Sequence, residues 1–279
     1  MERYKRSDRL VYITKHLLCN PGKSISLSYF TGILGAAKSS ISEDLTMIKL
    51  ALDNLDMGKL ETELGATGGV TYIPHKSKAT AIELAKELCG KLRKDDRIIP
   101  GGFIYMTDIT FSPQVASEVG EIFATCFRPC KPDYVVTVET KGVPLALFTA
   151  YYLGIPLLVA RREQRVTEGS TVSIAYVSGS SRRLQTMSLN RRSLSAGAKI
   201  VVMDDFMKAG GTAKGMHELI ADFKAEVVGT GVLMETSEPG EKLIDKYTSL
   251  LVLEGVDEER KKIMVRPSSW LLNGERKNK

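Results

Sequence analysis

Residues 200–212 are the part of this 279-residue chain that most restricts how it can fold. An apolar run at 200–203 is typical of a buried strand, and it leads directly into two adjacent acids, Asp204 and Asp205. A short loop with two glycines follows, and Thr212 then begins the next helix. This order predicts an α/β fold with a ligand bound beyond the carboxyl end of the strand.

The chemistry of this segment suits a phosphorylated sugar. Glycines let backbone N–H groups approach an anion, and a helix N-terminus adds donors and the positive end of its dipole. Lys208 can add a charge and Thr212 a hydroxyl, while the vicinal carboxylates of Asp204 and Asp205 are acceptors for the cis hydroxyls of a ribose. The predicted ligand-binding segment is Asp204, Asp205, Phe206, Met207, Lys208, Ala209, Gly210, Gly211 and Thr212.

The segment resembles the phosphoribosyl-pyrophosphate motif of the type I phosphoribosyltransferases, a hydrophobic strand followed by Asp-Asp-x-x-x-(Thr/Ala)-Gly-Gly-Thr. Adenine and xanthine phosphoribosyltransferases look most similar, over residues 133–253. The resemblance implies their α/β fold, a mainly parallel sheet with flanking helices. The residues themselves predict strands at 134–138, 157–160, 171–176, 199–203, 227–233 and 249–253, and helices at 113–127, 143–153 and 212–224. The tail after Arg260 is expected to be a solvated, partly frayed end.

The same resemblance gives roles to residues outside the motif. Family members have a pyrophosphate loop after the first core strand, and Thr140, Lys141 and Gly142 occupy that place here. They also have basic residues at the end of the next strand, where this chain has Arg161 and Arg162. Those two arginines can equally be an exposed pair.

Two aromatic residues have more than one interpretation. Phe206 can border the base position of a nucleotide or make an apolar core contact. Tyr105 lies upstream of the core, and we consider it a candidate lid for the pocket.

The first 75 residues follow a different pattern. Leu10, Ile13, Leu17 and Leu18 share one helical face, and a second short helix is predicted at 26–34. A third helix is predicted from Ser40, which has capping-box spacing with Glu43. Its apolar stripe is Ile41, Leu45, Ile48, Leu52 and Leu55. Strands at 59–64 and 70–74 then flank a glycine-rich turn. Three helices and a hairpin predict an N-terminal winged helix-turn-helix at 1–75, joined to an effector-binding domain at 76–279.

Basic residues gather at the start of the chain and indicate DNA binding. Residues 1–40 have seven Lys or Arg residues and two acids, a net charge of +5 that would supply salt-dependent phosphate contacts. Glu43 and Asp44 would repel phosphates, and winged helices also serve as protein-interaction modules. The predicted DNA contacts are Arg3, Lys5, Arg6, Lys38, Ser39, Ser40 and Ser42. A second basic region, with seven arginines between 161 and 192, is either a solvated face or a surface onto which DNA wraps.

Over its whole length the chain resembles the purine operon repressors of Gram-positive bacteria, including the opening Arg-Tyr-Lys-Arg-Ser-Asp-Arg-Leu and the loop Phe-Met-Lys-Ala-Gly-Gly-Thr. This resemblance implies a homodimer that binds double-stranded operator DNA, represses purine-biosynthesis genes and is released by phosphoribosyl pyrophosphate. Guanosine tetraphosphate or another purine nucleotide could share the pocket. No cofactor is expected to be required, and whether Mg²⁺ accompanies the effector is left open.

We expect the site to be non-catalytic. The enzymes close their site with a flexible loop between the second and third core strands, and the corresponding residues here, 163–170, are expected to form only a short segment. No base-recognition signature is evident, and a winged helix serves a regulator. The alternatives are a catalytically active purine phosphoribosyltransferase with a regulatory N-terminal domain and a nucleotide sensor that binds protein partners.

The four cysteines are too few for a disulfide framework, and the charged opening residues do not resemble a secretory leader. Reduced, buried thiols and a cytoplasmic protein are expected. Cys126-x3-Cys130 lacks a second ligand pair, so no metal site is expected. The uncharged run at 143–160 is interrupted by Pro144, Gly154 and Pro156, which argues against a membrane span.

Overall fold

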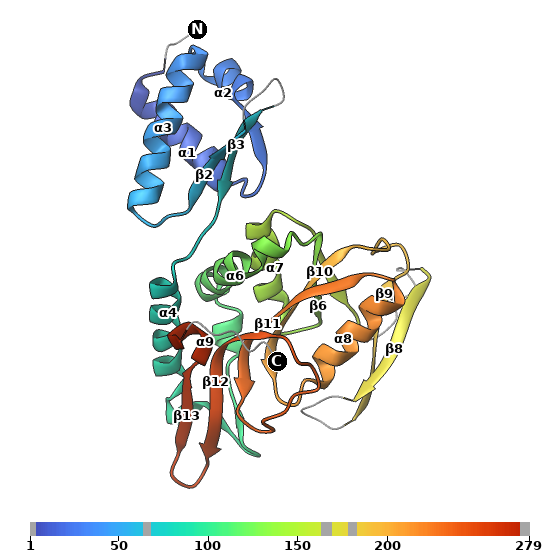
Figure 1. Cartoon of the computed structure of the whole chain (residues 1–279). Coiled ribbons are helices and arrows are strands. Elements are labelled where there is room, and N and C mark those ends of the chain that lie inside the picture. Colours follow the sequence, from blue (N-terminus) through green and yellow to red (C-terminus); the bar gives the residue numbers. More distant parts are fainter. Residues whose placement is uncertain (1–3, 64–67, 163–168, 178–182, 274–279) are drawn as a thin grey trace. The chain divides into compact units, whose positions relative to one another are not determined.

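A computed structural model describes residues 4–63, 68–162, 169–177 and 183–273. The chain divides into two compact units, residues 1–77 with 151–154, and residues 78–150 with 155–279 (Figure 1). The elements before residue 78 are α1 (Arg6–Leu18), β1 (Ser24–Ser26), α2 (Leu27–Leu34), α3 (Lys38–Asn54), β2 (Lys59–Thr62) and β3 (Gly69–Ile73).

The later helices are α4 (Lys78–Leu92), α5 (Thr107–Thr110), α6 (Pro113–Phe127), α7 (Val143–Leu153), α8 (Gly211–Asp222) and α9 (Ser269–Asn273), with 3₁₀ turns η1 (Asp95–Arg97) and η2 (Arg128–Cys130). The later strands are β4 (Ile98–Ile99), β5 (Phe103–Ile104), β6 (Tyr134–Val138), β7 (Leu157–Ala160), β8 (Thr171–Val177), β9 (Leu184–Asn190), β10 (Lys199–Met207), β11 (Glu226–Thr236), β12 (Thr248–Asp257) and β13 (Lys262–Pro267).

The first unit has the predicted three helices followed by an antiparallel hairpin. The Ser26 hydroxyl accepts a hydrogen bond from the Tyr29 amide at 3.3 Å and caps α2, which ends at Gly35 with a φ of 59°. The short β1 adds a third strand beside β3, in the order β1-β3-β2. The core between the helices and this sheet is formed by Ile13, Leu17, Phe30, Leu34, Ile41, Leu45, Ile48, Leu52, Leu60, Val70 and Tyr72.

Two details of the third helix differ from the sequence-based expectation. The helix starts at Lys38 with Ala37 as its N-cap, so Ser40 is the third helical residue and the capping box with Glu43 was wrong. Leu55 follows the last turn and is 67% exposed, so the buried stripe ends at Leu52.

The second unit is built on a six-stranded sheet in the order β13-β12-β11-β10-β6-β7. Strands β7, β6, β10, β11 and β12 pair in parallel, and β13 joins the edge antiparallel to β12. This confirms the predicted fold class. The central strands are apolar throughout because both of their faces are covered.

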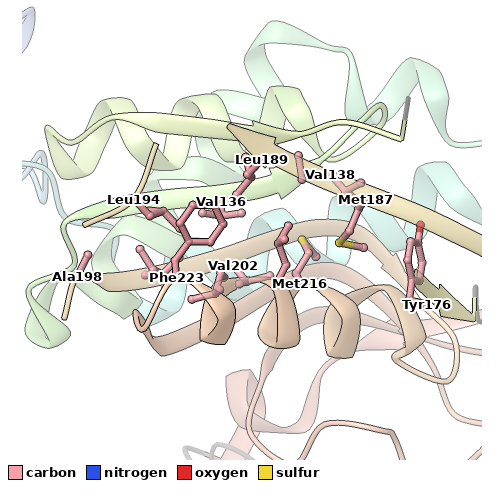
Figure 2. Close-up of a cluster of buried hydrophobic side chains, with 14 residues drawn as sticks. Val136, Val138, Tyr176, Met187, Leu189, Leu194, Ala198, Val202, Met216 and Phe223 are labelled. Carbon is pink, nitrogen blue, oxygen red and sulfur yellow. The ribbon is translucent and has the colours of Figure 1, made fainter. Parts of the chain in front are cut away.

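Alternate residues of β10 point to opposite faces of the sheet. Val202 packs in one cluster with Met216 of α8 and Phe223, the C-cap of that helix (Figure 2). On the other face, a Cβ at Gly231 of β11 would meet the Met203 sulfur at 2.7 Å and the Phe123 ring of α6 at 2.9 Å. Helices α8 and α6 therefore cover opposite faces.

Two predictions about the second unit were wrong. The strand predicted at 171–176 is not part of the core sheet, because β8 pairs antiparallel with β9 in a separate hairpin. The segment between the second and third core strands is therefore 161–198, much longer than the short segment expected. Residues 262–273 of the tail are also part of the fold, because Ile263 and Val265 of β13 and Leu271 of α9 are buried.

No disulfide links the four cysteines, all of which lie in the described part of the chain. Cys89 and Cys126 are buried, whereas Cys19 is exposed, contrary to the expectation that all four thiols would be buried. None of the helices within the described residues is long and apolar enough to cross a membrane.

Candidate functional site

A cavity of about 440 Å³ opens where the parallel strands β6 and β10 end. It therefore lies at the edge where open α/β sheets bind their ligands. The lining residues are Gly101, Gly102, Phe103, Ile104, Met106, Val138, Glu139, Thr140, Lys141, Arg162, Asp204, Asp205, Phe206, Met207, Lys208, Gly210, Gly211, Thr212, Ala213, Thr236 and Leu253.

The loop before α8 forms an anion-binding end of this cavity. Gly210 is the N-cap of α8 with a φ of 86°, a conformation that glycine adopts without penalty. The first residues of α8 line the cavity, so their unpaired N–H groups and the helix dipole are available to an anion there. The Leu243 amide donates to the Ala209 carbonyl at 2.9 Å and fixes the loop from behind.

Two carboxylates of β10 lie beside this loop. Asp204 is only 7% exposed, and its Oδ1 accepts a hydrogen bond from the Asp205 amide at 2.9 Å. Burial and the neighbouring Asp205 raise the pKa of the Asp204 carboxyl well above its usual value, while Arg162 opposes the shift. Both carboxylates are acceptors to which ligand hydroxyls can donate.

A second loop, between β6 and α7, packs directly against Asp204. A Cβ at Gly142 would lie 2.7 Å from Thr137 Oγ1 and 3.2 Å from Asp204 Oδ1. The loop is also tied to the end of β7, because Glu139 pairs with Arg161 at 3.2 Å and accepts from the Arg162 amide at 2.7 Å.

The structure gathers most, but not all, of the predicted ligand residues around the cavity. Asp204 to Lys208, Gly210 to Thr212, Thr140, Lys141 and Arg162 line it. Ala209, Gly142 and Arg161 lie behind the lining, where they contact the residues described above. Met207 is buried and also packs in a core cluster with Val232 and Ile244.

Tyr105 is 46% exposed and does not line the cavity, whereas the residues on both sides of it do. Sequence reasoning selected Tyr105 from this segment and missed its neighbours that do line the cavity, residues 101–104 and Met106. The pair Gly101-Gly102 was the sequence feature that could have revealed this segment. The two amides donate to the Glu258 carboxylate at 3.0 and 2.6 Å. Arg97 anchors the same region through two 2.8 Å hydrogen bonds to Asp108, which lower the pKa of that carboxyl.

The predicted DNA-contact residues lie in the first unit, apart from Arg3, which falls outside the described residues. Lys5, Lys38, Ser39 and Ser42 are exposed, and Ser40 is half-buried. Lys38, Ser39 and Ser40 form the first turn of α3.

Asp44 does not face solvent, although the sequence suggested that it would repel phosphates. It is fully buried and accepts from Arg9 Nε at 2.7 Å and Arg6 Nε at 3.2 Å. Arg6 also pairs with Glu43 at 3.5 Å. Arg6 therefore holds α1 against α3 as well as being a candidate for phosphate contact.

Comparison with known proteins identifies both parts of the chain. A family model described as "Bacterial purine repressor, N-terminal" matches residues 5–74, and "Phosphoribosyl transferase domain" matches residues 106–263. The purine biosynthesis transcriptional repressor PurR of Bacillus subtilis (strain 168) is 47% identical over 269 residues, covering 96% of this chain and 94% of the relative. The chain belongs to the bacterial purine repressor family. Another member, named the purine biosynthesis transcriptional activator PurR of Lactococcus lactis subsp. lactis (strain IL1403), is 39% identical over 262 residues, covering 94% and 97%.

Solved structures resemble the second unit of this purine repressor family member. Adenine phosphoribosyltransferase from Giardia lamblia, in complex with 9-deazaadenine, covers 62% of this chain and 96% of its own, with a TM-score of 0.51 and 19% identity. At that identity the likeness establishes the fold alone.

Proposed function

We propose that this chain is a DNA-binding repressor of purine-biosynthesis genes that phosphoribosyl pyrophosphate (PRPP) releases from its operator. One observation carries the proposal. A first unit that matches the purine repressor N-terminal family is joined, in one chain, to a cavity whose groups suit a ribose with phosphates at both ends.

The proposed fit of PRPP follows from the cavity lining. The hydroxyls of the ribose donate to Asp204 and Asp205, the acceptors that lie between the two loops. The monophosphate binds at the N-terminus of α8, where Lys208 adds a positive charge. The pyrophosphate binds on the other side, at Lys141 and Arg162.

Operator binding is proposed for the exposed start of α3 and the basic residues around it. Ser39 and Ser42 can approach base edges, while Lys5 and Lys38 contact phosphates. The exposed arginines of the β9 region, Arg183, Arg191 and Arg192, are a second region to which DNA is attracted. PRPP bound in the cavity would add negative charge to this unit and weaken that attraction.

The experiment that tests this function is a titration of purine-operon operator DNA, followed by fluorescence anisotropy, with and without saturating PRPP. Tight binding that PRPP weakens supports the proposal, and binding that PRPP strengthens contradicts it. A reporter gene under the same operator then decides the sign of regulation, which matters because the Lactococcus lactis relative is named an activator.

A catalytic phosphoribosyltransferase is the second candidate, and one observation favours it. The hairpin β8–β9 occupies the place, between the second and third core strands, where the enzymes have their closing loop. The sequence suggested that the segment here is too short to close a catalytic site. The hairpin removes that reason for expecting a non-catalytic site. Pyrophosphate release from PRPP with adenine, guanine, hypoxanthine or xanthine would identify an enzyme.

Three further components belong to the same proposal. The active species is a homodimer, which sedimentation can test. Guanosine tetraphosphate, which also has a ribose and diphosphate groups, competes for the PRPP cavity without releasing DNA. Titrations of PRPP with and without Mg²⁺ will show whether the metal enters with the ligand.

A further inference from the structure

Tyr176 of the β8–β9 hairpin connects three parts of the second unit. Its side chain is buried, and Figure 2 shows it at one end of the core cluster, near Met187 and Met216. Its hydroxyl donates to Gln185 Oε1 of β9 at 2.8 Å. The phenol is therefore held on one side by the hairpin itself.

On the other side, Tyr176 packs against the helix whose N-terminus faces the ligand cavity. A Cβ at Gly215 of α8 would lie 3.0 Å from the Tyr176 Cβ and 3.1 Å from the Met187 methyl group. The absence of a side chain at Gly215 thus allows β8 and β9 to approach α8 closely. Movement of this hairpin and of the start of α8 is coupled by packing.

Residues that line the cavity also act on the Tyr176 phenol. Burial and, more weakly, the negative charge of Asp204 raise the pKa of Tyr176, whereas Arg162 and Thr212 lower it. Both Arg162 and Thr212 line the cavity. A phosphorylated ligand bound beside Arg162 and Thr212 would change the charge around both residues.

The hairpin has a second attachment close to Arg162. Arg161 and Ser188 exchange two backbone hydrogen bonds of 2.9 and 2.8 Å, which tie the middle of β9 to the end of β7. The hairpin is therefore held to the site at both places where the ligand's phosphates are proposed to bind. Arg183, next to β9, and Arg191 and Arg192, directly after it, are exposed.

We infer that Tyr176 is a positioning residue that couples occupancy of the cavity to the β8–β9 hairpin, and through the hairpin's arginines to DNA. A ligand bound at the N-terminus of α8 and at the end of β7 shifts the two elements against which the hairpin is held, and Tyr176 transmits that shift through its packing on Gly215 and its hydrogen bond to Gln185. The inference rests on the proposed function, because it assumes that PRPP weakens operator binding.

The test is the variant Tyr176→Phe in the full chain, which keeps the ring packing and removes the hydroxyl. The coupling ratio is the operator Kd with saturating PRPP divided by the operator Kd without it. We expect this ratio to fall about 3- to 10-fold, the equivalent of one lost hydrogen bond, while the PRPP Kd of the free protein and the operator Kd without PRPP change less than about twofold. Tyr134→Phe is the matched control. Tyr134 packs against the same core cluster, but it is the first residue of β6, and the cavity lies at the other end of that strand.

Hydrogen exchange distinguishes coupling from a merely structural role. PRPP should change the exchange of amides in 171–177 and 184–190 in the wild type, and this change should shrink in Tyr176→Phe. If that variant unfolds, Gln185→Met removes the hydrogen-bond acceptor from the other side and should also lower the ratio. A wild-type ratio of one would refute the proposed function itself. A large wild-type ratio that Tyr176→Phe, or Gln185→Met in its place, leaves unchanged would refute only the role of Tyr176.

Discussion

Gly142 packs directly against Asp204 behind the lining of the ligand cavity, so the two loops proposed to bind PRPP form one packed unit. A Cβ at Gly142 would approach both the Cα and the Oδ1 of Asp204 to 3.2 Å. Nothing larger than hydrogen fits at position 142 unless the β6–α7 loop or the end of β10 moves.

Gly142→Ala should therefore weaken PRPP binding with little loss of global stability. Overpacking of this kind costs about 1–3 kcal/mol. Because the added methyl group displaces the loops that bind PRPP, we expect the PRPP Kd to rise on the order of tenfold. Calorimetric titration measures the effect. Gly90→Ala is the matched control, since nothing lies within 4 Å of its added Cβ, and an equal loss of affinity in both variants would contradict the explanation.

Asp204→Asn should separate stability from effector binding. The folded-state pKa of this carboxyl is raised by burial and by Asp205, so its negative charge destabilises the fold at neutral pH. Protonated Asp204 makes its full contribution to stability below the unfolded-state pKa. This contribution is lost as the pH rises through the folded-state pKa. The amide should thus increase the free energy of unfolding at pH 7, and the gain should disappear as the pH falls below the unfolded-state pKa.

The same variant should bind PRPP more weakly by about 1–3 kcal/mol, because the ribose hydroxyls lose a charged acceptor. Operator affinity without PRPP should stay close to that of the wild type, giving a super-repressor that PRPP does not release. Asp205→Asn and Lys208→Ala should share this phenotype. Normal release by PRPP in all three variants would place the ribose elsewhere.

Asp44→Ala should unfold or strongly destabilise the first unit. Removing the buried carboxylate leaves the guanidinium groups of Arg9 and Arg6 without their main partner, at a cost of about 3–5 kcal/mol. Hydrogen exchange of α1 and α3 amides in the full chain reports this unit separately. Glu43→Gln is the control, because it removes a mostly exposed and longer ion pair and should cost less than about 1 kcal/mol. An equal cost for both variants would contradict the role of Asp44 as the main partner of the two arginines.

The salt dependence of operator binding should identify the phosphate contacts. Lys5→Ala and Lys38→Ala should each reduce the slope of log K against log salt by about one unit. Arg6→Ala should reduce the slope less than either, because its guanidinium is shared with Asp44 and Glu43. Unchanged slopes for both lysine variants would show that DNA binds elsewhere.

Local sequence signals predicted most of the core and of the cavity. The strands 134–138 and 157–160 were predicted to the residue, because apolar runs between turn residues specify buried strands. The segment 204–212 was found because acids, glycines and a helix start lie next to one another in the sequence.

The features that the sequence did not reveal depend on partners far away in the chain. Leu184–Asn190 is a strand because it pairs with β8, and Lys262–Pro267 because it pairs with β12. Asp44 appeared to be a surface acid because its partner Arg9 lies 35 positions earlier. The lining segment 101–106 is likewise held by Glu258, which is 156 positions from Gly102.

The central claim is that PRPP and operator DNA oppose each other on one protein, and linkage provides its most direct test. PRPP should be titrated calorimetrically into the free protein and into the protein saturated with operator DNA. If PRPP is the inducer, its Kd must be higher for the complex than for the free protein, by the same factor by which PRPP raises the operator Kd. Equal PRPP affinity in the two states would contradict release by PRPP, even if Asp204 and Asp205 proved to bind it.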